Sequence, residues 1–144
     1  MTDSRVFEKD KLDFPSLLEK FKADLPEEVG AIGSFIGIVR KKAKKNGKVE
    51  KLHYESAESV DDELERIATD FEEDFEDISK VTIYHVVDDL GPGDEIVYVL
   101  VAGYHRGEVF DVLPKIMDRV KSEVHIWKKE ITDEDEYWVH EVEN

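Results

Sequence analysis

A histidine–arginine pair, His105 and Arg106, stands where a long apolar segment gives way to a helical pattern. A junction of this kind directs backbone N–H groups and the positive end of the helix dipole toward one point. With two cationic side chains beside it, the junction is typical of a site that binds an anion. The simpler alternative is an arginine that pairs with one of the many carboxylates and a histidine that packs at the start of the helix.

Lysines near the C-terminus form a second candidate site. Lys121 ends a helical pattern, and Lys128 and Lys129 follow Trp127 in an alternating segment. In a strand, Trp127 and Lys128 face opposite sides of the sheet. A lysine held near other cations has a lowered pKa and can act as an acid, a base or a nucleophile near neutral pH. The structural alternative for Lys121 is a cation that stabilises the C-terminal end of its helix.

Arg40 is the third candidate cation. It ends a glycine-containing apolar segment and precedes a basic stretch at residues 41–48. The alternative for Arg40 is a simple charge at the end of a strand. The basic stretch contains Asn46 and Gly47, which favours a mobile loop at the tip of a hairpin. Its other interpretation is a flap that contacts an anionic ligand or an acidic partner.

The sequence lacks the motifs of several other chemistries. It has no Gly-x-Gly-x-x-Gly, no Walker loop and no His-Glu-x-x-His, and its remaining histidines show no metal-ligand spacing. It has no cysteine, which excludes a thiol nucleophile, a disulfide framework and a thiolate metal site. We therefore expect neither a metal nor a cofactor.

The composition indicates one acidic domain over residues 1–144. The chain has 36 acidic and 20 basic side chains, a formal net charge of −16, and enough hydrophobic residues, 40 %, for a packed core. This charge makes nucleic acids and anionic membranes poor partners. No apolar run approaches the roughly 20 residues of a membrane helix. The first residues lack the pattern of a signal peptide, so we expect a cytoplasmic protein.

The first half of the chain alternates between strand and helix patterns. Glycines in residues 30–39 permit close backbone approach and favour a buried strand, which the basic loop joins to a return strand in a hairpin. The acidic residues between 61 and 77 fill one face of a helix, as in a solvated surface, with a protein-docking face as the alternative. We expect strands at residues 5–8, 30–39 and 49–55, and helices capped by Asp13 and Ser59.

The second half predicts strands at residues 80–87 and 94–104 around a turn, then a helix at 107–122 that Pro114 should kink. The tail at 124–141 predicts two short strands. Strands outnumber helices, and tight turns join several of them. The pattern therefore favours an α+β fold with a mixed or mostly antiparallel sheet and two to three helices.

At these same residues the sequence resembles the large, catalytic subunit of molybdopterin synthase. This family typically has a lysine seven residues before the first lysine of a Trp-Lys-Lys-Glu block, here Lys121 and Lys128, and a His-Arg pair after a long strand. The two motifs together are much more specific than either alone. The matching segments keep their order and cover most of the chain. They are residues 30–40, 52–56, 83–99, 105–106, 117–130 and 137–139.

The resemblance implies an α/β-hammerhead fold and a homodimer at the centre of a heterotetramer. Each protomer would bind a small ubiquitin-like sulfur-carrier subunit whose C-terminal Gly-Gly carries a thiocarboxylate. Its sulfur would pass to cyclic pyranopterin monophosphate (precursor Z), and two transfers would form the dithiolene of molybdopterin in molybdenum cofactor biosynthesis. By position, Lys121 and Lys128 match the family's catalytic lysines, while Arg40, His105 and Arg106 match its substrate-binding cations.

This chemistry agrees with the residue types. Arg40, His105 and Arg106 would hold a phosphate, and lysine can donate and accept a proton while the cyclic phosphate opens. No cysteine is needed, because the sulfur arrives on the partner. Our hypothesis makes Lys121 the principal acid and base, with Lys128 supporting the developing charge. The alternative function is a non-catalytic module that binds ubiquitin-like tails and does not need this pocket.

Overall fold

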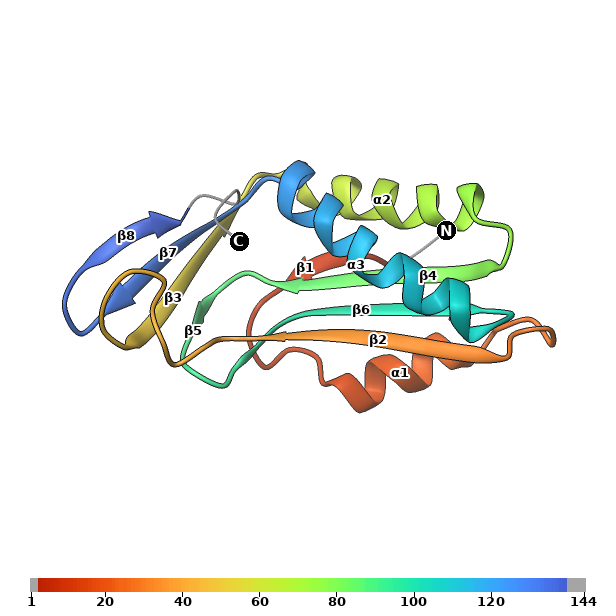
Figure 1. Ribbon diagram of the computed structural model, residues 1–144, viewed down its shortest axis with the longest axis horizontal. Helices are drawn as coiled ribbons and strands as arrows, with labels where there is room; N and C mark the ends of the chain where they lie inside the picture. Colours follow the sequence, from red (N-terminus) through yellow and green to blue (C-terminus); the bar gives the residue numbers. More distant parts are fainter. Residues whose placement is uncertain (1–2, 140–144) are drawn as a thin grey trace.

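A computed structural model describes residues 3–139, with three helices and eight strands. The elements are β1 (Arg5–Phe7), α1 (Phe14–Lys22), β2 (Ala31–Ile38), β3 (Val49–Ser56), α2 (Val60–Asp74), β4 (Ile78–Val86), β5 (Asp89–Leu90), β6 (Glu95–Gly103), α3 (Arg106–Glu123), β7 (Ile126–Thr132) and β8 (Glu136–Val139). They form one sheet in the order β1–β4–β6–β2 and a second in the order β5–β3–β7–β8 (Figure 1). Only β1 and β4 pair in parallel among these strands, so the predicted α+β fold with a mostly antiparallel arrangement is confirmed.

The central strands of the first sheet, β4 and β6, are buried on both faces. In β4, Val81 and Ile83 belong to one hydrophobic core, and Tyr84 and Val86 belong to another. Helices α2 and α3 cover the first of these faces, and α1 lies on the other (Figure 1). This two-sided burial explains the continuous apolar run of β6.

The predicted hairpin across the basic loop is wrong. Strand β2 pairs with β6 in the first sheet, whereas β3 pairs with β5 and β7 in the second. Lys42 and Lys48 form one isolated bridge between the two arms of the loop. The long apolar strand β6 offers β2 a partner along its whole length, so the chain crosses from one sheet to the other at this loop.

Strand β2 is also an edge strand and is not buried as expected. Phe35 is 39 % exposed and Ile38 is 53 % exposed. The predicted close backbone approach is confirmed at Gly33, where an added Cβ would lie 2.6 Å from Cγ1 of Val109 on α3. A side chain at this position would push the helix away from the sheet.

The helix ends agree with the sequence in part. Asp13 caps α1, because its Oδ1 accepts the N–H of Ser16 at 2.9 Å. Ser59 precedes α2 as expected, but its hydroxyl donates to Glu63 (3.0 Å) and makes no capping bond. Helix α3 continues through Pro114. Within residues 3–139, no helix is long and apolar enough to cross a membrane.

The connecting segments add one strand that the sequence did not indicate. The short strand β5 lies inside the predicted turn between β4 and β6 and pairs with β3. The two predicted strands of the tail are present as β7 and β8. The last two residues of that predicted tail, 140–141, lie outside the described residues.

Candidate active site

A cavity of about 360 Å³ lies where both sheets meet the C-terminal part of α3. Its walls come from β2 and the loop after it, β3, β4, β6, α3, β7 and β8. Most of the lining is apolar, with a group of cations among it. The cationic lining residues are Arg40, Lys42, Lys44, Lys121 and Lys128.

The register of β3 and β7 directs Lys128 into this cavity. Lys128 lies opposite Tyr54, and both line the cavity. The next residue, Lys129, faces the other side of the sheet, where its Nζ lies 2.8 Å from Oε1 of Glu136 and over the ring of Trp138. The alternation that the sequence predicted for this segment is therefore confirmed.

The surroundings of Lys128 disfavour its charged form. Burial lowers the pKa of Lys128, and the neighbouring charges of Lys44, Lys121 and Arg40 lower it further, whereas Glu130 acts in the opposite direction. A lysine of this kind exchanges its proton more readily near neutral pH than an exposed lysine does.

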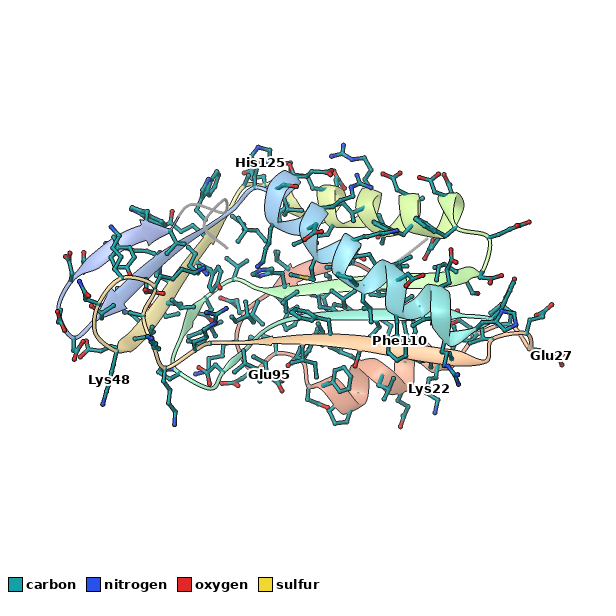
Figure 2. The ribbon with its side chains drawn as sticks, viewed as in Figure 1. Lys22, Glu27, Lys48, Glu95, Phe110 and His125 are labelled. Carbon is teal, nitrogen blue, oxygen red and sulfur yellow. The ribbon has the colours of Figure 1, made fainter. Side chains whose placement is uncertain are left out.

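Lys121 enters the cavity from the last turn of α3, and the turn after this helix carries the chain into β7. Glu63 of α2 holds that turn. Its Oε1 accepts the backbone N–H of His125 at 2.9 Å, and its Oε2 lies 2.6 Å from Nδ1 of the same residue. His125 is seen where α3 meets β7 (Figure 2). This contact ties the connection between the elements that carry Lys121 and Lys128 to α2.

The basic loop lies against β7 and β8, and it is not the tip of a hairpin between β2 and β3 as the sequence predicted. The N–H of Lys44 donates to Oε1 of Glu130 (2.8 Å), and the N–H of Lys45 donates to the hydroxyl of Tyr137 (3.1 Å). The Lys45 ammonium also lies 4.4 Å from the centre of the Tyr137 ring. These contacts bring Lys42 and Lys44 to the cavity.

His105 and Arg106 lie at the opposite end of α3 from Lys121. The helix is continuous over the fifteen residue steps from Arg106 to Lys121, which is about 22 Å. His105 is exposed, with its Nδ1 3.4 Å from Oδ2 of Asp77. The structure thus brings Arg40, Lys121 and Lys128 together, and within one chain it does not bring His105 and Arg106 to them.

Comparison with known proteins gives the family. The family model described as "MoaE protein" matches residues 7–123. The chain belongs to the MoaE family. A molybdopterin synthase catalytic subunit from Pyrococcus abyssi is 38 % identical over 111 residues, which are 76 % of this chain and 74 % of that protein. A probable molybdopterin synthase from Haloferax volcanii is 36 % identical over 88 % of this chain, which spans about half (49 %) of that relative's length.

Solved structures share the fold of this MoaE chain. A molybdopterin synthase structure from Staphylococcus aureus superposes with a TM-score of 0.83 at 26 % identity, over 96 % of this chain and 98 % of that one. A complex of subunits 1 and 2 of molybdopterin-converting factor from Helicobacter pylori gives a TM-score of 0.69 at 19 % identity, over 89 % and 84 % of the two chains. The second likeness supports the fold alone.

Sequence reasoning missed the uncharged and acidic polar groups of the cavity in this MoaE protein. Tyr54, His85 and Glu130 are each less than 9 % exposed and line the cavity. Glu130 stands two residues after Lys128 on the same strand, so period-two spacing would have placed it on the same face. His85 had no such signal, because a single histidine in an apolar strand is usually a packing residue.

The arrangement can bind an anion and move a proton. Five cations supply hydrogen-bond donors for phosphate oxygens, and Lys128 supplies an exchangeable proton. Within residues 3–139, no three His, Asp or Glu side chains come together as a metal ion would need.

Proposed function

We propose that this chain is the catalytic subunit of a molybdopterin synthase. It transfers sulfur from the C-terminal thiocarboxylate of a small ubiquitin-like subunit to precursor Z and so forms the dithiolene of molybdopterin. One observation carries the assignment: Arg40, Lys121 and Lys128 line a single cavity in a member of the MoaE family.

The phosphate of precursor Z binds to Arg40, with Lys42 and Lys44 of the basic loop beside it. Lys121 and Lys128 form the proton-transfer pair. Our hypothesis from the sequence gives the main acid and base role to Lys121. The lowered pKa of Lys128 supports a proton-transfer role for this lysine as well. A protonated lysine donates to the phosphate oxygen that leaves when the ring opens. A neutral lysine accepts a proton from the water that cleaves the acyl–sulfur bond, which leaves the sulfur on the substrate and a carboxylate on the small subunit.

The partner subunit and a second copy of this chain complete the enzyme. The apolar edge of the first sheet supports a homodimer, because Phe35 and Ile38 of β2 and Phe110 of α3 are exposed there. Phe110, which is 64 % exposed, is labelled on α3 (Figure 2). In such a homodimer, at the centre of a heterotetramer, His105 and Arg106 contact substrate in the cavity of the other protomer, since their own cavity is about 22 Å away.

A subunit-mixing experiment tests this shared site. Arg106→Ala and Lys121→Ala homodimers should each be inactive. A dimer with one subunit of each variant should regain up to half of the activity of the wild-type dimer, because one of its two sites is intact. No recovery from dimers shown to have exchanged subunits would contradict a site shared between the two protomers.

We propose one domain for residues 1–144, because both sheets build the same cavity. A cytoplasmic location is consistent with the absence of cysteine.

Reconstitution of sulfur transfer tests the function. The chain is mixed with the ubiquitin-like subunit as its thiocarboxylate, precursor Z is added, and mass spectrometry follows the dithiolene product. Binding of the ubiquitin-like subunit is measured separately by calorimetry. Product supports the enzyme. Tight binding without product would favour the non-catalytic module that recognises ubiquitin-like tails.

A further inference from the structure

We propose that His85 is a further substrate-recognition residue, which presents the lone pair of its Nε2 to the cavity as a neutral acceptor for an N–H group of the substrate's heterocycle. The inference rests on the proposed function and specifies which end of the substrate lies against β4.

The hydrogen bonding of His85 fixes its tautomer. His85 is 7 % exposed, lines the cavity, and packs its ring edge-on against Tyr54 with 5.3 Å between the ring centres. Its Nδ1 lies 2.8 Å from the backbone oxygen of Val86. Because a carbonyl oxygen only accepts, Nδ1 carries the hydrogen of this bond. In the neutral ring, Nε2 is then an acceptor.

The Nε2 atom of His85 opens toward the cavity. Among residues 3–139, every fully enclosed side-chain nitrogen or oxygen has a hydrogen-bond partner. No residue in that range hydrogen-bonds Nε2 of His85, whose one polar contact is made through Nδ1. Nε2 is therefore not sealed in the core but reached from the cavity that its ring lines.

The surroundings keep the imidazole neutral. Burial lowers the pKa of His85 to about 4, and the positive charge of Lys128 acts in the same direction, against the hydrogen bond to Val86. The titratable and charged groups around the cavity are Tyr54 from β3, Lys128 and Glu130 from β7, Lys121 from α3, and Arg40, Lys42 and Lys44 from the basic loop. Most of these groups are cations, and their positive charges disfavour a protonated, positively charged His85.

An acceptor is scarce in this cavity. Its arginine and its protonated lysines only donate hydrogen bonds. Oε1 of Glu130 already accepts from the N–H of Lys44 and from the hydroxyl of Tyr137. Precursor Z has a phosphate at one end and pterin N–H groups at the other. The cations of the cavity would bind the phosphate, and His85 would accept a hydrogen bond from one of the N–H groups. A site that hydrogen-bonds an N–H rejects an analogue without it far more strongly than an apolar site does.

Two substitutions separate hydrogen bonding from packing. His85→Phe keeps a ring but removes Nε2, whereas His85→Gln retains a carbonyl oxygen that can accept. In the reconstituted enzyme, we expect His85→Phe to raise KM for precursor Z by about 10- to 100-fold, in proportion to a lost buried hydrogen bond, and His85→Gln to stay within a few-fold of the wild type. The control is His53→Phe, a half-exposed histidine bonded to Asp89 and Glu55 outside the cavity, which should leave KM unchanged.

A measurement on the wild-type protein decides the matter even where a variant does not fold. In ¹⁵N NMR of labelled histidine, we expect the Nδ1–H tautomer for His85 and an upfield shift of Nε2 when precursor Z is added without the partner. A hydrogen on Nε2, or a resonance unmoved by saturating precursor Z, would overturn the inference, as would equal KM values for folded His85→Phe and wild type. If the resonance shifts but reconstitution yields no product, the proposed function fails and the recognition role stands.

Discussion

Tyr54 and Lys128 lie directly opposite each other in the antiparallel pair of β3 and β7. Side chains at opposed positions point to the same face, so Lys128 enters the cavity beside a buried aromatic ring. Lys129 points to the other face and pairs with Glu136. Two successive lysines therefore have different environments, and one of them has a lowered pKa.

This alternation gives a matched pair of substitutions. We expect Lys128→Ala to lower the rate of sulfur transfer by about 100-fold or more, because it removes one of the two lysines that we propose transfer protons. Lys129→Ala removes the same charge from the same strand and should leave the rate within about two-fold, since an exposed ion pair contributes little. Single-turnover rates measure both. Similar losses in the two variants would show that the lysines act through strand stability.

Anion binding provides a second prediction. Phosphate at about ten times its Kd should raise the Tm of the wild type by roughly 4 °C through mass action. Arg40→Ala should lose most of this increase, because it removes a cavity cation. Lys22→Ala, at the exposed end of α1, should keep it. Thermal melts at matched ionic strength compare them, and an equal increase in all three proteins would contradict a phosphate site at Arg40.

The contact between Glu63 and His125 predicts a cost in stability. Burial raises the pKa of Glu63, but hydrogen bonds from His125 and Ser59 outweigh it and hold the pKa below its ordinary value. Glu63→Gln should lower the free energy of unfolding at pH 7 by about 1–2 kcal/mol, because it removes a charge-assisted bond. The neighbouring Asp62→Asn, on the exposed side of α2, should change little.

Urea unfolding at a series of pH values tests how the contribution of Glu63 to the free energy of unfolding changes with pH. A carboxyl group with a lowered pKa stabilises the fold above its unfolded-state value of 4.5, and this contribution is lost as the pH falls through the folded-state pKa. The difference between wild type and Glu63→Gln should therefore shrink below pH 4.5. A constant difference would assign the effect to packing.

The sequence predicted most elements because their signals are local. Asp13, with Pro15 after it, marked the start of α1, and the apolar run of residues 94–104 gave β6 within about one residue at each end. The pairing of strands was not local. Residues 46–47 favour a hairpin, but the partner of β2 is decided by β6, about sixty positions away in the chain. The pairing that forms depends on how much apolar surface each alternative buries. A short local motif does not carry this information.

The site was predicted only in part, because some of its residues are close in sequence and others come together only in the fold. Lys121 and Lys128 are close in sequence and remain close in space, since one turn joins their elements. Arg40 was a candidate from its place at the end of a predicted strand, but only the family resemblance grouped it with the two lysines. The same resemblance grouped Arg106 with them, but a rigid helix separates it from Lys121 in one chain. His85 carried no pattern, because the bond that orients it is to its neighbour's backbone.

The burial of His85 predicts a pH dependence of folding. Its pKa is 6.5 in an ordinary setting and about 4 in the fold. An unfolded chain therefore binds a proton at this residue that the folded chain does not, and stability falls as the pH drops from 6.5 toward 4, by about 3 kcal/mol in total. The raised pKa of His53 acts oppositely in this range, so the difference between wild type and His85→Phe isolates the effect. A difference that does not change between pH 7 and 4.5 would contradict a neutral buried imidazole.

The rate of dithiolene formation by Lys121→Ala tests the central claim most directly. The variant is first shown to fold and to bind the thiocarboxylated subunit like the wild type, and product is then followed by mass spectrometry in a single turnover with precursor Z. The account predicts a loss of at least about 100-fold, in line with removal of a positioned acid or base. Product formation at a near-normal rate would contradict the assignment of the cavity lysines as the catalytic pair.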